Sequence, residues 1–332
     1  MQAQARSRFL KNKAAVAGTA IVFALVAFAS IGPALVSHDP LESDFVRGIS
    51  ADGAPVGPNA VFLLGTDRLF RDVLARLAYA GRLSLLICIC ATAIATGIGA
   101  LVGIVAGWHE GGRARVPWPI LAGLCAAGAA LAAGRPRLAA LGLVAGVAAA
   151  GARRFGGPRL DIDGWLMRSV DVLLAFPFLL LVMAIGAALD RSSAVTIFVT
   201  LGVTSWLGIA RVLRAKTMQV RSLEYIVAAR ALGQSTMAIL FSHVLPNVAG
   251  PLFVSATILA GQMIVADAVL SYLGVGIAPP TPTWGRMLFE GQDLYVGAPW
   301  LVAAPGVAIL LAVWGFSMLG EGLRDALDPH QA

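Results

Sequence analysis

Two acidic residues, Asp171 and Asp267, lie inside long apolar stretches of the sequence. A charged side chain in a hydrocarbon layer is costly, so such residues usually face a cavity, a partner or a solute path. Asp171 follows Arg168 by three residues, which on a helix allows an ion pair near the end of the stretch. Asp267 lies deeper. It is expected either to hydrogen-bond a helix of a partner subunit or to line a path and meet an amine or a cation.

Few residues in this sequence are candidates for catalysis. The four histidines all lie outside the apolar stretches, at His38, His109, His243 and His330. An intramembrane enzyme needs a buried pair such as Ser with His, two Asp, or an H-E-x-x-H motif, and no such pair is evident. The chain also has no G-x-x-x-x-G-K-[ST] phosphate loop, and His109-Glu110 has no second histidine nearby to complete a metal site. We therefore expect no catalytic residue, no metal site and no cofactor in this chain.

The composition indicates a polytopic membrane protein. Of 332 residues, 58% are hydrophobic and only 13% are charged, about half the charged share of an ordinary soluble domain. Three cysteines are too few for a disulfide scaffold. The net charge of +7 does not indicate nucleic-acid binding, because the basic residues do not gather in one soluble segment. The first apolar stretch is longer than the roughly 7–15 residues of a signal peptide, so we expect an uncleaved helix.

About 20 apolar residues in a helix cross the hydrocarbon core of a membrane. Six strong stretches are long enough, at Ala14–Ser37, Leu83–Gly107, Ser169–Leu189, Ala194–Ala210, Val248–Val275 and Trp300–Gly320. Two weaker, Ala-rich stretches, Pro117–Ala133 and Leu138–Ala152, predict an added helical hairpin. Most of the 25 Lys and Arg fall on inner segments when the N-terminus is cytoplasmic. We therefore predict an all-α polytopic membrane protein with eight transmembrane segments, or six if the hairpin does not span, and with both termini inside.

The inner loop 211–247 is too polar to span a membrane and too patterned to be a passive tether. Ser222 and Glu224 predict the start of a helix, and Gly233 predicts its end. A second amphipathic segment is expected with Met237, Leu240, Phe241 and Val244 on one face, closed by Pro246. Spacing alone fits both a hairpin lying on lipid headgroups and an element that docks into a cleft of a soluble partner.

The same loop resembles the "EAA" loop of ABC importer permease subunits. The resemblance rests on Ala228-Ala229-x3-Gly233 followed by His243-x-Leu245-Pro246. The acidic first position of the family motif is Val227 here, and Glu224 lies one turn earlier without occupying that position. In the family this loop forms a coupling helix that docks in a groove of the ATPase. The resemblance therefore implies these ATPase-coupling residues: Glu224, Ala228, Ala229, Gly233, His243, Leu245 and Pro246.

Further motifs along the chain resemble the dipeptide, oligopeptide and nickel branch of these permeases, and the second subunit of its pair. They are Phe9–Ala14, His38–Pro40, Leu64–Asp67, Arg71–Arg76, Met167–Asp171, Leu174–Pro177, Leu270–Gly276, Pro279–Gly285 and Gly322–Pro329. The stretch Gly112–Leu160 has no counterpart in that pattern and looks like an inserted hairpin. The implied organisation is a cytoplasmic segment 1–13, two core helices with a long outer loop in 14–107, the insertion 108–160, four core helices in 161–322 and a cytoplasmic tail 323–332.

The resemblance implies a permease of the cytoplasmic membrane that imports small peptides or a related solute, with nickel and glutathione-like solutes as alternatives. Its partners would be a second permease subunit, two ATP-binding subunits that hold ATP and Mg²⁺, an extracytoplasmic substrate-binding protein and membrane lipid, but no nucleic acid. Expected contacts with the binding protein are Asp67, Arg71, Asp72, Trp284 and Glu290. A secondary transporter is the alternative, and it requires a discontinuous helix, for which Pro177 is a candidate break.

Overall fold

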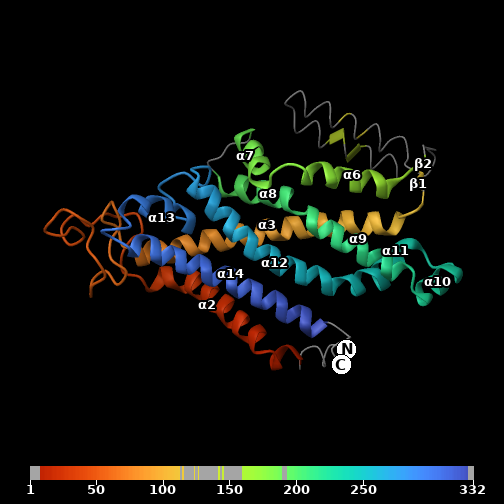
Figure 1. Ribbon diagram of the computed structural model, residues 1–332, viewed down its shortest axis with the longest axis horizontal. Helices are drawn as coiled ribbons and strands as arrows, with labels where there is room; N and C mark the ends of the chain where they lie inside the picture. Colours follow the sequence, from red (N-terminus) through yellow and green to blue (C-terminus); the bar gives the residue numbers. More distant parts are fainter. Residues whose placement is uncertain are drawn as a thin grey trace.

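The computed structural model describes residues 8–112, 159–188 and 193–327, and residues 114, 115, 123, 126, 141, 142, 144 and 145 between them. Long helices run side by side along the long axis (Figure 1). The outer loop 36–72 and helix α13 (Trp284–Gly291) lie at one end, and helix α10 (Glu224–Ala231) lies at the other. The described part of the chain thus places the predicted outer loop and the predicted inner loop at opposite ends of the bundle.

The first two long helices each begin at a side-chain cap. Helix α2 (Lys13–Leu35) starts after Asn12, whose Oδ1 accepts from the backbone N–H groups of residues 14 and 15. Helix α3 (Val73–His109) starts after Asp72, whose Oδ1 accepts from the N–H of Leu74 at 2.8 Å. These caps satisfy backbone donors that have no partner inside the helix. At 37 residues, α3 is about 55 Å long and extends well beyond a hydrocarbon core of about 30 Å.

Two predicted spans are bent. Helices α6 (Ile162–Leu174) and α7 (Phe178–Ala188) meet at 92°. Pro177 lies in the break, where its missing N–H and fixed ring prevent a continuous helix. Helices α8 (Ala194–Ser205) and α9 (Leu207–Arg221) meet at 40°. The α6–α7 break is the discontinuity for which the sequence offered Pro177.

The second half of the inner loop is helical and continues directly into the next long helix of the bundle. Helix α11 (Thr236–Ile239) passes through the π-helical turn η1 (Leu240–Val244) into α12 (Leu245–Tyr272). The prediction that Pro246 closes a short helix is therefore wrong. Pro246 occupies the first turn of α12, where a proline needs no N–H partner. The wider π turn accommodates it, and the helix continues to Tyr272.

The remaining elements are a short turn and a long helix that follow α13, and two short strands that flank the predicted insertion. After α13 come the 3₁₀ turn η2 (Gln292–Leu294) and helix α14 (Trp300–Leu327). Strands β1 (Ala114–Arg115) and β2 (Arg159–Leu160) pair antiparallel, with Ala114 opposite Leu160. This pairing holds together the two ends of the predicted insertion. The hairpin stretches Pro117–Ala133 and Leu138–Ala152 themselves lie outside the residues that are described, apart from isolated positions.

The helices confirm a helical polytopic membrane protein. In the described residues, four helices are long and apolar enough to cross a membrane, and up to six spans result if each bent pair counts as one. Two helices extend well beyond the predicted stretches, because they continue on charged residues that a hydropathy pattern leaves out. Thus α3 begins ten residues before Leu83, and α9 ends at Arg221 instead of Ala210. Asn12 donates to Asp325 at 2.9 Å, which places the start of α2 beside the end of α14.

Small residues allow α3 and α9 to approach closely. Gly99, Gly103 and Gly107 form a stripe with a four-residue period on α3. A Cβ at Gly103 would lie 2.5 Å from the carbonyl oxygen of Ala210 and 2.8 Å from the Cβ of Leu213. Inside a membrane, where burial of apolar surface adds little, this close packing of small residues is a main source of helix association.

Replacing Gly103 by Ala is expected to destabilise the fold by about 1–3 kcal/mol, because the added methyl overlaps the α9 backbone. Gly97 provides a matched control on the same helix, since a Cβ there meets nothing within 4 Å. Gly97→Ala should be neutral or slightly stabilising because Ala favours helix more than Gly. Thermal denaturation of both variants in detergent would measure the difference, and equal stabilities would contradict close α3–α9 packing.

Candidate functional site

The inner end carries an exposed helix followed by a left-handed glycine. Helix α10 buries Ile226 and leaves Tyr225 and Val227 exposed on its surface. Gly233 has φ of +79°, and the N–H of Gln234 donates to the carbonyl of Ala229 at 3.1 Å. This is the hydrogen bond of a glycine-terminated helix end. The prediction that Gly233 ends the first helix is confirmed.

Two local predictions in this loop are wrong. Ser222 does not cap α10. It ends α9, its Oγ donates to the carbonyl of Gln219, and Leu223 takes the N-cap position instead. The expected apolar face of the second segment is wrong in part: Val244 is buried and Leu240 packs against the core as expected, but Ile239 is the other buried residue. Met237 and Phe241 are exposed. A π turn shifts the phase of the helix, so a regular 3.6-residue pattern assigns the wrong face.

The predicted coupling residues lie together at this end. His243 contacts Gln234 at 3.3 Å and the ring of Tyr225 at 5.9 Å between centroids, so η1 lies against α10. Asn247 donates to the hydroxyl of Tyr225 at 3.1 Å and to the carbonyl of His243 at 2.7 Å. Of the remaining set, Ala229 packs against the core and the others are exposed, namely Glu224, Ala228, Leu245 and Pro246. Leu232, which is 88% exposed, adds a large apolar side chain to the surface.

Two arginines, one on α10 and one at the end of α9, contact the end of α3, and the sequence patterns did not single them out. The guanidinium of Arg230 lies 4.2 Å from the ring centroid of Trp108 at the end of α3. Arg221 donates to the carbonyl of Trp108 at 2.7 Å and pairs with the carboxylate of Glu110 at 3.1 Å. Partial desolvation, and then the neighbouring charge of Arg221, lower the pKa of Arg230, although the residue is exposed. Helix α10 therefore contacts the end of α3 through Arg230, and α9 contacts it through Arg221.

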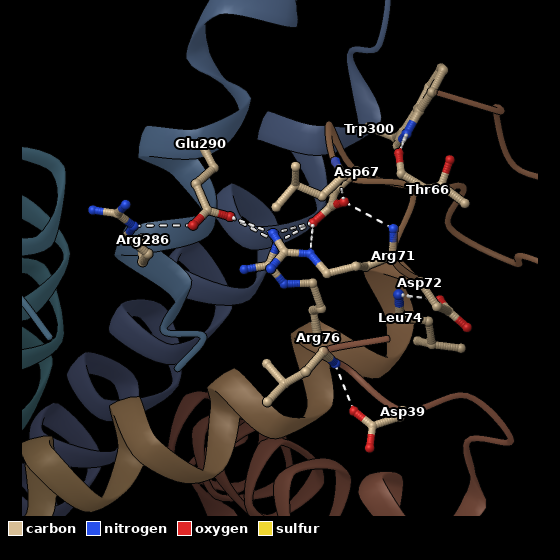
Figure 2. A network of polar contacts seen from close by, with 12 residues as sticks. Asp39, Thr66, Asp67, Arg71, Asp72, Leu74, Arg76, Arg286, Glu290 and Trp300 are labelled. Carbon is tan, nitrogen blue, oxygen red and sulfur yellow. Dashed lines mark hydrogen bonds and ion pairs between the residues drawn. The ribbon is translucent and has the colours of Figure 1, made fainter. Parts of the chain in front are cut away.

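The outer end is held by a network of buried charges, drawn in Figure 2. Asp67 pairs with Arg71 at 2.7 Å and also with Arg76. Glu290 of α13 pairs with Arg76 at 2.8 Å, with Arg71 at 3.2 Å and with Arg286 at 3.1 Å. Arg76 is only 1% exposed. The network therefore fastens the outer loop, the first turn of α3 and α13 to one another.

The charged network also shifts the pKa of Asp67. Burial by itself would raise the pKa of Asp67, but the positive charge of Arg76 and hydrogen bonds from Arg71 outweigh it. The pKa of Asp67 is therefore held below its ordinary value of 3.8. A lowered carboxyl pKa stabilises the folded state fully at pH values above the ordinary pKa. That stabilisation is lost as the pH falls through the lowered value.

Most of the predicted contacts for a binding protein are buried inside this chain, and their contact with a binding protein stays a prediction. Asp67, Arg71, Asp72 and Trp284 are all buried. Asp72 caps α3 and contacts His38 at 2.8 Å, and the indole N–H of Trp284 donates to the carbonyl of Leu77 at 3.2 Å. Only Glu290 is partly exposed. These residues hold the outer end together, because segments far apart in the sequence supply each other's polar partners.

The two intramembrane carboxylates have internal partners. Asp171 pairs at 2.5 Å with Arg211 of α9, not with Arg168, and this pair is exposed. Asp267 is 2% exposed and accepts from the hydroxyl of Ser84 at 3.3 Å, so no solute reaches it in this conformation. Asp163 pairs with Arg214 at 2.5 Å. The sequence patterns did not predict this ion pair, whose only local signal is an acidic residue in the first turn of α6. No group of three metal-ligating side chains occurs in the described residues.

A largely apolar cavity of about 560 Å³ lies beside the α6–α7 bend. Its walls come from α6, α7, α8, α9, α12 and α14, and its polar groups belong to Thr204, Ser205, Gln262 and Ser317. Gln262 and Asp267 are on different sides of α12. Gln262 lines this cavity, whereas Asp267 is buried and accepts a hydrogen bond from Ser84 of α3. The sequence signal nearest this cavity is Pro177, because residues on both sides of the helix break line the cavity.

Two segments of the chain match models of known protein families. Residues 142–332 match the family described as binding-protein-dependent transport system inner membrane component. Residues 2–49 match the N-terminal transmembrane domain of oligopeptide transport permease C. The matches together cover both the start of the chain and the half that contains the inner loop.

Curated relatives align over nearly the whole chain. A di/tripeptide transport system permease protein of Pseudomonas aeruginosa is 34% identical over 97% of this chain and 89% of its own length. A dipeptide transport system permease protein of Alkalihalophilus pseudofirmus is 32% identical over 98% and 89%. A glutathione transport system permease protein of Pectobacterium atrosepticum is 32% identical over 97% and 89%. The resemblance carried by the inner loop is confirmed. The chain therefore belongs to the binding-protein-dependent transport system inner membrane component family, and it is a multi-pass protein of the cytoplasmic membrane.

Proposed function

We propose that the chain is a permease subunit of an ATP-binding cassette importer that moves small peptides across the cytoplasmic membrane. The relatives named for dipeptides, di/tripeptides and glutathione support this substrate class, since glutathione is itself a peptide. The observation that carries the proposal is the exposed helix α10, which ends at Gly233 and presents Leu232 at the inner end of the bundle.

The proposed machine places ATP hydrolysis on other subunits. Two ATP-binding subunits hold ATP and Mg²⁺, a second permease subunit completes the membrane part, and a binding protein delivers the solute. The coupling residues identified from the sequence, from Glu224 to Pro246, form the surface that meets an ATPase. Closure of the ATPases would press on α10 and, through Arg221 and Arg230, on the end of α3. A two-state rocking of the helices then follows from contacts that differ between the states.

We further propose that both termini and α10 are cytoplasmic and that the Ala-rich insertion adds two membrane segments to a six-span core. The Lys and Arg bias of the inner segments supports this orientation. On the outer face, the charge network positions the loop that the binding protein meets, and the exposed apolar residues Phe45, Val46 and Leu63 supply contact surface there. The solute path follows the apolar cavity beside the α6–α7 bend, near Asp171 and Arg211.

A secondary transporter is the second candidate, because its substrate sites lie at discontinuous helices and α6–α7 bends by 92°. The two functions differ in their energy source. Peptide uptake by the reconstituted importer should require ATP hydrolysis and the binding protein. Uptake by this chain alone, driven by an ion gradient, would overturn the proposal.

Replacing the exposed Leu232 by Glu is expected to reduce co-purification of the ATPases and peptide uptake by about tenfold, because a charge would be buried in an apolar contact. Val296 at the outer end offers a matched control, being 81% exposed. Val296→Glu should leave ATPase co-purification unchanged. Co-purification from the co-expressed complex measures both variants, and equal recovery of the ATPases with L232E would reject this docking surface.

A further inference from the structure

A polar cavity of about 430 Å³ lies between the end of α3 and the segment that runs from α10 to α11. It is separate from the apolar cavity at the α6–α7 bend: α9 contributes to both, but no residue lines both. Trp108 and Glu110 contribute from the α3 side, Arg221 from α9, and Arg230 and Thr236 from the exposed inner segment. None of the motifs in the sequence marked this cavity as a site.

The charges that line this cavity are unbalanced. Its titratable groups are His109, Glu110, Arg221 and Arg230. Arg221 is paired with Glu110 and also donates to two backbone carbonyls, of Trp108 and of Glu110, at 2.7 and 3.0 Å. Arg230 lies over the Trp108 ring and forms no ion pair with a described residue. Among the two arginines and Glu110, the walls carry one positive charge without a partner carboxylate, and both guanidinium groups line the cavity.

This surplus charge defines the chemistry of a ligand. Arginine presents a planar fork of donors that matches the oxygens of a phosphate, and such charge-assisted hydrogen bonds are strong. The cavity volume is ample for one phosphate group, and Thr236 and Gln234, whose side chains carry a hydroxyl and an amide, also line it. Trp108 lies in the last turn of the long helix α3, and tryptophan near a helix end is typical of the headgroup level of a membrane.

We propose that the cavity between Trp108, Arg221 and Arg230 binds a phosphate group, supplied by an anionic lipid headgroup or by inorganic phosphate. The bound group contacts Arg230 of α10 and Arg221 of α9 at once, and Arg221 is already fastened to the end of α3. It therefore ties the exposed inner segment to the membrane bundle and reduces the freedom of α10. The site is distinct from the apolar surface around Leu232.

The test uses the full chain assembled with its partner subunits in phosphatidylcholine nanodiscs. Thermal denaturation is measured with increasing inorganic phosphate, against sodium chloride at equal ionic strength, because a ligand of the folded state raises its stability with concentration. We expect a phosphate-dependent rise for the wild type. Arg230→Gln should weaken the apparent affinity about tenfold or more, the effect of losing a charged hydrogen-bonding group.

Two further variants keep the result independent of folding defects. Lys216 of α9 contacts Gln219 outside the cavity, so Lys216→Gln removes the same charge and should leave phosphate affinity unchanged. Glu110→Gln removes the repelling carboxylate and should tighten phosphate binding several-fold, the opposite sign to R230Q. A general loss of structure cannot produce both signs.

A lipid arm separates the two sources of phosphate. Nanodiscs containing phosphatidylglycerol should stabilise the wild type more than phosphatidylcholine alone and should weaken the response to added inorganic phosphate if the headgroup occupies the cavity. An unchanged phosphate response would assign the site to soluble phosphate. The proposal is overturned if R230Q and K216Q respond alike to both ligands. It is also overturned if R230Q lowers ATPase co-purification but leaves the responses to phosphate and to phosphatidylglycerol unchanged. The cavity would then accept an acidic side chain of the ATPase.

Discussion

Replacing Asp67 by Asn is expected to destabilise the protein by about 3–5 kcal/mol, because it leaves buried guanidinium groups without their shared carboxylate. Arg76 would remain almost fully buried with Glu290 alone, and Arg71 would lose its shortest ion pair. Asn keeps the carbonyl oxygen that accepts from the backbone of residues 69 and 71, so the turn itself can survive. The loss therefore reports the buried charges and not the loop backbone.

Asp44 in the same outer loop provides the control for this variant. It also accepts from two backbone N–H groups and pairs with an arginine, Arg47, at 2.8 Å, but that pair is exposed to solvent. Exposed ion pairs contribute little, so Asp44→Asn should have no measurable effect. Thermal denaturation and the rate of trypsin cleavage after Arg68 would compare the two. Equal behaviour of D67N and D44N would show that the outer end does not depend on the network.

Replacing Gly233 by Val is expected to abolish coupling between the ATPases and transport. Its φ of +79° is a left-handed conformation that a β-branched residue adopts only at a cost of about 1–2 kcal/mol or more. The inner segment would relax away from the turn that joins α10 to α11, and the surface around Leu232 would no longer have its shape. Uptake of peptide and co-purification of the ATPases should both fall about tenfold or more, while Gly233→Asn, which tolerates this conformation, should retain most of both.

Gly274 at the outer end of α12 is a matched control for the backbone strain. Its φ is +76°, and the N–H of Val275 donates to the carbonyl of Leu270 at 2.9 Å in the same pattern as at Gly233. A Cβ at either glycine meets nothing within 4 Å. Gly274→Val should lower thermal stability to a similar extent and leave ATPase co-purification intact. Loss of the ATPases in G274V as well would mean that strain alone disrupts assembly.

The positions of the spans could be predicted because a membrane makes strong local demands. Every backbone group in lipid must be satisfied within its own helix, so each crossing requires a continuous apolar stretch that hydropathy detects. The end of α10 was also predictable, because Gly233 is a local signal for a left-handed cap. The ends of α3 and α9 were not, since both helices continue past the lipid on charged residues whose partners lie elsewhere. The face of η1 was missed because a π turn breaks the helical period.

The roles of the polar residues depended on contacts between distant segments. Arg71 meets Glu290 across 219 residues, and Arg221 meets Glu110 across 111. Asp67, Asp72 and Trp284 looked like surface residues of an outer face, yet each is enclosed by its own chain. Thus the sequence by itself determined a helical membrane protein, its family and the turn at Gly233. Only the tertiary structure decided which charges are buried partners, because that depends on how the helices pack and not on any local pattern.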